Sequence, residues 1–465
     1  MTADSTQHNT GKVRAAALTA LVNVCRLVLG VTFIFSGFVK AIDPLGTQYK
    51  IQDYLAAMGL AQYVPDMLTL IVSVCLAALE FSLGVFILLA MHRRSVSKLI
   101  VVFMGLMTLL TVWIAIFNPV KDCGCFGDAV HLTNVQTLLK NIVLLFCALV
   151  VAKWPLRMYR FLSRSTQWIA VNYTILFILI LSGYCLYYLP VFDFRPYHIG
   201  VNIKQGMTIP KDAPQPEFET TFILQKNGVK KEFSLEDYPD STWQFVDSKT
   251  VQTKEGYVPP IHDFSIQRPD GEDITDSVLT CKGYVFLLVS PHLEQADDSN
   301  FGAIDQIYEY CEEQHVPFYC LTASDSKAIS HWENITGAEY PFRLTDETTL
   351  KTIIRSNPGL LLLKNGTIIR KWSHNDLPGA DTLNAPLDKL EIGKMPDESA
   401  GKTLTKVVLW FFLPLLILVF ADRTWAWSKF IRKNINERKK KIKDEEEKIE
   451  NKSNKILSTF KNKKQ

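Results

Sequence analysis

The stretch RLVLGVTFIFSGFVKAIDP, residues 26–44, decides the fold of this chain. Together with the apolar residues before it, it is long enough to cross a bilayer, which takes about 20 apolar residues in a helix. Similar runs recur along the chain and predict six membrane spans, at 16–38, 67–91, 97–117, 136–153, 168–191 and 405–421. The sequence therefore predicts an integral membrane α-helical bundle. No small-x-small cleavage site follows the first span, so we expect this span to be retained.

The composition excludes several other classes of protein. The chain has 465 residues, of which 48% are hydrophobic and 21% are charged. A disordered chain is less apolar than this, and neither a plain soluble enzyme nor a collagen-like fibre contains such long apolar runs. Nine cysteines are also too few for a small secreted scaffold that is held together by disulfides.

Basic and acidic residues are segregated along the chain. The stretch 192–402 has 20 basic and 33 acidic residues, whereas the tail 423–465 has 15 basic and 6 acidic residues. The loops after the second and fourth spans are also basic, and cytoplasmic loops are enriched in Lys and Arg. We therefore expect a multi-pass protein of the bacterial inner membrane, with residues 1–14 and the tail in the cytoplasm and the acidic stretch in the periplasm. The tail should bind anionic membrane lipids rather than nucleic acid.

Two charged residues lie inside predicted spans, Arg26 in the first and Glu80 in the second. An unpaired charge near the bilayer centre costs about 3 kcal/mol on insertion scales. Because the two spans are antiparallel neighbours, we expect Arg26 and Glu80 to face each other as an intramembrane charge pair. Such a pair is either a proton or quinone site or a structural ion pair that fixes helix packing. The cofactor is therefore unknown, with a quinone as the one candidate.

The acidic stretch divides into two parts. Residues 192–259 are predicted to be β-rich, with a hairpin turn at Asn227-Gly228. Residues 260–400 alternate between strands and helices, which favours a mixed sheet flanked by helices. The predicted strands are 283–289 and 316–323, the predicted helices are 301–313, 326–335, 346–356 and 384–391, and a second hairpin is predicted over 356–372.

This order of elements, with Pro358 at the start of the second hairpin, resembles the thioredoxin fold over about 260–392. The resemblance implies an extracytoplasmic α/β thioredoxin-like domain in which Pro358 is the cis proline. The dithiol of that family would follow the first core strand, where residues 290–293 read SPHL. Thiol–disulfide exchange needs one thiolate that attacks and a second thiol that resolves the mixed disulfide. We therefore interpret this domain as a docking module.

Three cysteines lie in the thioredoxin-like region, Cys281, Cys311 and Cys320. Cys320 lies in a strand pattern and is predicted to be a buried packing residue, because free cysteine behaves as a small hydrophobe. A disulfide can form outside the cytosol, but the sequence does not select a pair among the three.

The loop NPVKDCGCFGDAVHLTN, residues 118–134, places Cys123 and Cys125 one glycine apart. We interpret these two cysteines as the candidate catalytic residues. A disulfide between them would close a small, strained ring and would be easily reduced. A metal site would need two further ligands, for which only His131 and His292 suggest themselves, so no metal is predicted. The alternative is a turn in which two small cysteines pack.

The spans and this loop together resemble the DoxX-like family, and within it the branch similar to the methylamine utilisation protein MauE. The resemblance covers about residues 15–155. The residues that carry it are Arg26 with LVLGVTFIFSGFVKAIDP (27–44), Asp53 to Gly59, Glu80 with Gly84, and DCGCFGD (122–128). It implies a four-helix membrane domain that is linked to respiratory or thiol redox chemistry and to disulfide maturation. The spans 168–191 and 404–422 are additional to this domain.

These observations predict a membrane protein that supports periplasmic thiol–disulfide or respiratory redox processes, as a component of a membrane thiol–disulfide oxidoreductase. Its partner would be a periplasmic or membrane protein. The rival hypothesis is a scaffold without enzymatic activity, in which the cysteines are structural. A small-solute transporter is disfavoured, because Arg26 and Glu80 are the only charged residues near the middle of the four predicted spans of the core.

Overall fold

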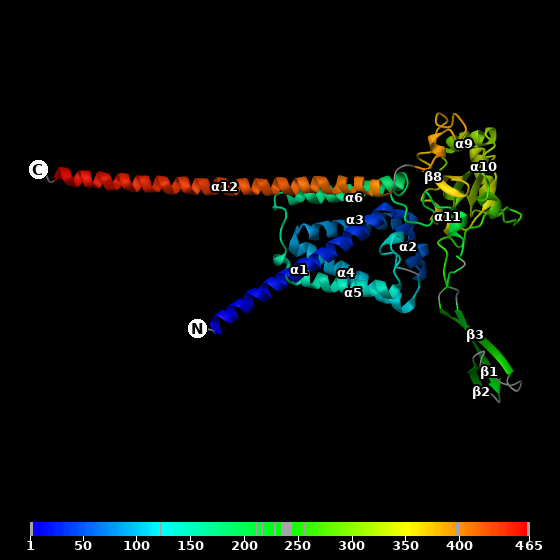
Figure 1. Ribbon diagram of the computed structural model, residues 1–465, viewed down its shortest axis with the longest axis horizontal. Helices are drawn as coiled ribbons and strands as arrows, with labels where there is room; N and C mark the ends of the chain where they lie inside the picture. Colours follow the sequence, from blue (N-terminus) through cyan, green and yellow to red (C-terminus); the bar gives the residue numbers. More distant parts are fainter. Residues whose placement is uncertain are drawn as a thin grey trace. The chain divides into compact units, whose positions relative to one another are not determined.

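The computed structural model describes residues 3–120, 123–210, 212–214, 217–226, 229–233, 244–254, 256–396 and 400–462. The chain forms two compact units (Figure 1). The membrane unit comprises Met1–Leu186, Pro190–Phe192 and Glu398–Gln465. The α/β unit comprises Tyr187–Leu189 and Asp193–Asp397.

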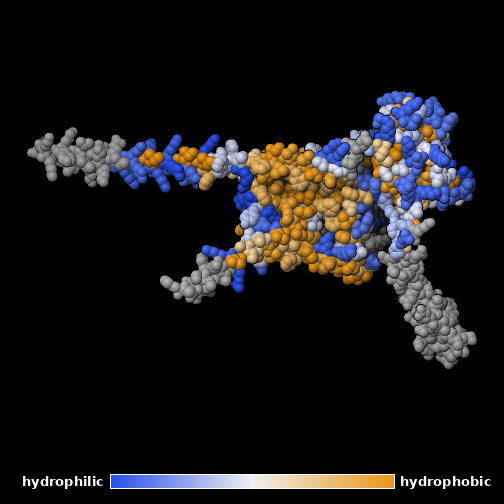
Figure 2. Space-filling view, in the orientation of Figure 1, coloured by the Kyte–Doolittle hydropathy of each residue, from blue (hydrophilic) through white to orange (hydrophobic). Residues whose placement is uncertain are grey.

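Six helices among the described residues are long and apolar enough to cross a membrane. They are α1 (Ala3–Ile42), α3 (Asp66–Leu88), α4 (Arg93–Phe117), α5 (Asn134–Lys153), α6 (Gln167–Tyr187) and α12 (Ala400–Asn462). Figure 2 shows an extensive apolar surface on the membrane unit. Apolar side chains of α4 such as Leu109 and Ile116 are exposed. Soluble monomers rarely expose so large an apolar patch. The predicted helical membrane region is therefore confirmed.

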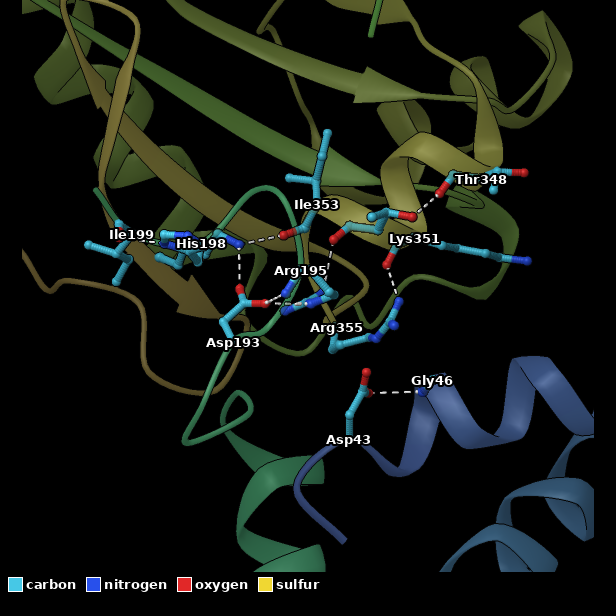
Figure 3. A network of polar contacts seen from close by, with 12 residues as sticks. Asp43, Gly46, Asp193, Arg195, His198, Ile199, Thr348, Lys351, Ile353 and Arg355 are labelled. Atoms are coloured by element: carbon cyan, nitrogen blue, oxygen red, sulfur yellow. Dashed lines mark hydrogen bonds and ion pairs between the residues drawn. The ribbon is translucent and has the colours of Figure 1, made fainter. Parts of the chain in front are cut away.

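A short helix, α2 (Pro44–Ala57), follows α1 where the predicted spans leave a loop. Its start is determined by Pro44, which suits the first helical position, and by Asp43, which caps the helix. The Oδ1 atom of Asp43 accepts a hydrogen bond from Gly46 N at 2.9 Å (Figure 3). The other short turns of this unit are η1 (Ala61–Tyr63), η2 (Gly127–Ala129) and η3 (Pro155–Arg157). Helix α1 extends to Ile42, so Lys40 lies within α1 and not in a loop.

Helices α1 and α3 approach closely because glycines lie at their interface. A Cβ atom on Gly37 would lie 2.7 Å from Phe81 Cα, and one on Gly84 would lie 2.6 Å from Ile34 N. Small residues allow the backbones of membrane helices to come into contact in this way. These contacts fix the register of the two helices and with it the position of every polar side chain between them.

The α/β unit contains a five-stranded mixed sheet with the order β6-β5-β4-β7-β8. The strands are β4 (Tyr284–Ser290), β5 (Phe318–Thr322), β6 (Phe342–Leu344), β7 (Gly359–Lys364) and β8 (Thr367–Ser373). Strands β4, β5 and β6 are parallel, whereas β7 and β8 are antiparallel to their neighbours. The peptide bond between Asn357 and Pro358, just before β7, is cis. This topology confirms the predicted thioredoxin-like fold.

Helices cover the sheet, and two apolar cores lie on its two faces. The helices are α7 (Ile203–Gly206), α8 (Thr275–Leu279), α9 (Phe301–Glu313), α10 (Ser326–Thr336) and α11 (Glu347–Ile353), with the turns η4 (Leu293–Gln295) and η5 (Glu391–Gly393). Along β4, Leu287 belongs to one core and Phe286 to the other. Successive side chains of a strand point to opposite faces, so a continuous apolar strand supplies both cores.

The predicted helix over 384–391 is wrong. This segment contains turns, followed by η5. Pro386 lacks the backbone N–H that a helix interior requires, and Tyr310 holds the segment by donating a hydrogen bond to Ala385 O at 2.7 Å. Burial of Leu383 and Leu387 in the core thus determines the path of the chain here.

A separate antiparallel sheet has the order β2-β1-β3 and consists of β1 (Glu217–Lys226), β2 (Val229–Phe233) and β3 (Gln244–Lys254). Lys226 pairs with Val229, as a hairpin requires. The predicted turn residues Asn227 and Gly228 lie outside the described residues.

The close packing of α1 on α3 predicts different effects for two helical glycines. Gly37→Ala should lower the free energy of unfolding by about 1–3 kcal/mol, because the added methyl group overlaps the α3 backbone. Gly105→Ala in α4 is the matched control, because its Cβ would meet no atom within 4 Å. Thermal unfolding of the detergent-solubilised full chain measures both. Equal stability of the two variants would contradict this packing.

Candidate functional site

The candidate site is the loop between α4 and α5, which contains Cys123 and Cys125. The loop is closed at its base by Asn134, the first residue of α5, which donates hydrogen bonds to Asn118 Oδ1 at 2.5 Å and to Val120 O at 3.0 Å. Gly124 adopts a φ of +63°, a left-handed conformation that favours glycine. The tight turn at Gly124 brings the two cysteine side chains to the same side.

The two thiols are in contact, and the backbone that carries them is held on both sides. The Sγ atoms of Cys123 and Cys125 lie 2.7 Å apart. Tyr54 of α2 donates a hydrogen bond to Cys123 O at 2.6 Å. Lys40 and Ser36 of α1 approach Cys125 O at 2.7 and 2.8 Å. The pair is therefore positioned by two helices outside its own loop.

Lys40 forms a buried ion pair with Glu80. Its Nζ atom lies 2.8 Å from Glu80 Oε2, and both residues are 5% exposed. The ammonium group has three donors, and three acceptors surround it: Glu80 Oε2, Ser36 Oγ at 2.7 Å and Cys125 O. A buried charge is tolerated when it is paired and fully hydrogen-bonded in this way.

The predicted pair of Arg26 with Glu80 is wrong. Gly37 is level with Phe81 and Gly30 is level with Leu88 in the α1–α3 interface. Arg26 therefore lies beyond the end of α3, about 18 Å along the helix axis from the level of Glu80 at 1.5 Å per residue. The sequence-based span ended at residue 38, but α1 continues to Ile42 and brings Lys40 to Glu80 instead.

Arg26 binds the last carbonyl group of α3 and two oxygen atoms of other segments. It donates hydrogen bonds to Leu88 O, to Tyr159 O at 2.9 Å and to Asn23 Oδ1 at 3.1 Å. Its guanidinium group also lies 5.1 Å from the ring centroid of Phe161. The last carbonyls of a helix lack intrahelical partners, and a cation there also interacts favourably with the helix dipole. The contacts of Arg26 thus stabilise helix packing, and they lie far from the cysteines.

The surroundings of the loop favour a thiolate on Cys125. The hydrogen bond with the Cys123 thiol lowers the pKa of Cys125, although burial opposes this. Lys140 and Lys40 also favour the thiolate, whereas Glu80 disfavours it. The hydrogen bond to Cys125 and burial raise the pKa of Cys123 in turn. One thiolate beside one thiol is the arrangement that thiol–disulfide exchange requires.

A small cavity of about 40 Å³ lies beside the loop. Its polar lining includes Ser36, Glu80, Cys125, Lys140 and Asn141. A cavity of about 150 Å³ is needed to hold a benzene ring, whereas a water fits in far less. The cavity can therefore hold water, but the quinone considered from the sequence does not fit it.

The α/β unit has no thiol where the family dithiol would lie. Ser290 Oγ instead donates a hydrogen bond to Asn357 Oδ1 at 2.6 Å, and Asn357 Nδ2 donates to His292 O at 2.8 Å. Cys311 and Cys320 are buried in the core, and burial raises the pKa of both, to about 12 for Cys311. Thiols of this kind are chemically inert.

A polar cluster in the α/β unit was not predicted from the sequence (Figure 3). Asp193 accepts hydrogen bonds from Arg195 Nε at 2.7 Å and from Lys371 Nζ at 2.8 Å. Burial alone would raise the pKa of Asp193, but these two cations hold it well below its usual range. Lys371 also donates to Ile353 O at 2.6 Å. The charges of the cluster are paired with one another inside this unit, and we therefore assign the cluster to its stability.

The sequence analysis did not identify four residues of the membrane site, namely Ser36, Lys40, Tyr54 and Lys140. Ser36 and Lys40 are four residues apart and therefore lie on one helix face, which is a signal that the sequence contains. Tyr54 and Lys140 carry no comparable signal. No group of three or more His, Cys, Asp or Glu side chains that could hold a metal ion occurs among the described residues.

The buried ion pair predicts strong energetic coupling between Lys40 and Glu80. Lys40→Met and Glu80→Gln should each lower the free energy of unfolding by about 3 kcal/mol, because each leaves a buried charge without its partner. The double variant should lose clearly less than the two single variants added together. Denaturant-induced unfolding of the detergent-solubilised protein measures this coupling.

The matched control is the pair Arg26→Met and Glu80→Gln. Their effects should add to within about 0.5 kcal/mol, because distant sites are energetically independent. Stronger coupling of Glu80 to Arg26 than to Lys40 would contradict the observed geometry.

Family models match two parts of the chain, one in the membrane unit and one in the α/β unit. Residues 18–153 match the family model of the methylamine utilisation protein MauE, and residues 218–255 match that of a domain of unknown function, DUF8463. The chain matches no curated protein. Among solved structures the chain is similar to a candidate protein disulfide isomerase from Bacteroides thetaiotaomicron, with 18% identity and a TM-score of 0.21. The similarity covers 24% of this chain and 76% of that chain. Over residues 18–153, which include both loop cysteines, the membrane unit is thus similar to the MauE family.

Proposed function

We propose that this membrane protein exchanges electrons with thiols through Cys123 and Cys125. The observation that carries the proposal is the contact of the two Sγ atoms at 2.7 Å in a loop whose backbone is held by other helices. Two structural cysteines would need neither this contact nor a lowered thiol pKa. The similarity to the MauE family over the same residues is consistent with it, but it assigns no activity to this chain.

The exchange needs no group besides the two cysteines and a partner. The Cys125 thiolate attacks one sulfur of a partner disulfide, forms a mixed disulfide and releases the first partner thiolate. The Cys123 thiol then loses its proton and attacks the Cys125 sulfur, which closes the Cys123–Cys125 disulfide and releases the second partner thiolate. Two electrons pass to the partner, and the reverse sequence oxidises a partner dithiol.

We propose the bacterial inner membrane as the location, with the cysteine loop and the α/β unit in the periplasm. Support comes from the charge distribution, since the basic residues concentrate in the tail and in the loops of the opposite side. An oxidising compartment is also where a cysteine pair can cycle through a disulfide.

We propose that the α/β unit serves as a docking module for a periplasmic or membrane protein. Support comes from a thioredoxin-like sheet without an accessible thiol at residues 290–293. Such a unit can bind a partner, but residues 290–293 offer no dithiol for thiol–disulfide exchange with it. The basic tail would in addition bind anionic lipids of the cytoplasmic leaflet.

The redox proposal predicts that the loop cysteines change their oxidation state in intact cells. Alkylation with a mass tag, with and without inhibition of respiration, should give two populations that differ by two thiols. Cys123→Ser and Cys125→Ser should each abolish the change, because the disulfide needs both residues. Cys147→Ser in α5 is the control and should leave it intact. Identical tagging under all conditions would favour the scaffold hypothesis instead.

The topology proposal predicts that a reporter active only in the cytoplasm is silent when fused after Asn300, and active when fused after residue 465. Fluorescence of the two fusions at equal protein amounts measures this. A fluorescent Asn300 fusion would place the α/β unit in the cytoplasm. The cysteine loop would then not lie in an oxidising compartment, and the topology proposal would be wrong.

A further inference from the structure

We propose that Lys140 is the counter-cation of the Cys125 thiolate and sets the redox equilibrium of the Cys123–Cys125 pair. The inference rests on the proposed function and assigns to Lys140 a role that neither the family similarity nor the sequence motif indicates. Lys140 acts on the cysteines through its charge and is therefore a positioning residue of the site.

Lys140 lies beside the cysteine loop. It is located in the second turn of α5, and its Nζ atom lies 4.3 Å from the ring centroid of Phe126, the residue that follows Cys125. Lys140 and Cys125 also line the same cavity of about 40 Å³. The contact with Phe126 keeps the ammonium group at the loop.

Lys40 and Lys140, the two lysines that favour the Cys125 thiolate, differ in whether a carboxylate pairs with them. The charge of Lys40 is matched by Glu80 at 2.8 Å. Within the described part of the chain, no carboxylate lies within ion-pair distance of Lys140. From α2, Tyr54 binds the Cys123 carbonyl and the side chain of Lys50 packs against Gly124. Lys140 is therefore the cation whose natural counter-charge is the thiolate.

This balance has a direct redox consequence. When the Cys123–Cys125 disulfide oxidises a partner dithiol, the products are the Cys123 thiol, the Cys125 thiolate, one proton and the partner disulfide. The thiolate form is stabilised by Lys140, whereas the disulfide carries no charge for Lys140 to balance. A stabilised reduced form makes a disulfide more oxidising. Lys140 should thus favour transfer of electrons from the partner to this protein.

The test uses the purified full chain in detergent and compares Lys140→Met with Lys140→Arg. The first measurement is the rate of iodoacetamide modification of the 123–125 peptide between pH 5 and pH 9. Lys140→Met should raise the midpoint of this profile by about one pH unit and slow the reaction at pH 6 up to tenfold. Lys140→Arg should restore the wild-type profile, because it keeps the charge.

The second measurement is the dithiol–disulfide equilibrium against glutathione. Lys140→Met should shift the equilibrium constant toward the disulfide by up to tenfold, which corresponds to about 30 mV for two electrons. Lys153→Met is the matched control, because Lys153 lies on the same helix and also contacts an aromatic ring, that of Trp154 at 4.8 Å. This control should leave both measurements unchanged.

The outcomes separate the inference from the proposed function. If Lys140→Met leaves both the pH profile and the equilibrium at wild-type values, the inference is wrong even if the cysteines cycle in cells. If the cysteines do not cycle in cells but the pH profile shifts as expected, the counter-cation role holds and the proposed function fails. If Lys140→Met lowers the melting temperature and Lys140→Arg fails to restore the profile, Lys140 supports the fold and the inference is also wrong.

Discussion

The buried ion pair between Lys40 and Glu80 is the interaction on which the candidate site depends. It joins α1 to α3 inside the membrane unit, and the same ammonium group holds the Cys125 carbonyl. A charge in this environment is stable only while all its hydrogen bonds are made. Movement of the cysteine loop away from the bundle would therefore leave a donor of Lys40 without its partner. The loop is consequently held by the energetics of the bundle in addition to the hydrogen bonds at its own base.

This constraint separates the two kinds of charge in the membrane unit. Arg26 donates a hydrogen bond to the carbonyl group of Leu88 at the end of α3, as a helix-capping cation does. The charges of Lys40 and Glu80 compensate each other beneath the cysteine loop. In our proposal it is therefore Lys140 that stabilises the Cys125 thiolate. Within the site, Lys40 is paired with Glu80, whereas Lys140 contacts the ring of Phe126.

The α/β unit shows how a fold can be kept without the chemistry usually associated with it. The sheet order and the cis bond before Pro358 are those of a thioredoxin-like domain. The position of the dithiol is occupied by Ser290 and the residues after it, and Asn357 holds this segment through hydrogen bonds. Function resides in sites and not in folds. The reactive thiols of this chain are for that reason to be sought in the membrane unit.

The sequence alone was sufficient to predict the membrane helices and the thioredoxin-like sheet, and to single out Cys123 and Cys125 as candidates. Apolar length and the alternation of strands with helices are local properties, so they can be recognised from neighbouring residues. The partner of Glu80 could not be recognised in this way, because it depends on the register of α1 against α3. That register is set by the contacts of Gly37 and Gly84 across the interface, and a shift of a few turns exchanges Arg26 for Lys40. The tertiary structure decided this pairing because helix packing, unlike helix formation, depends on residues that are distant in the sequence.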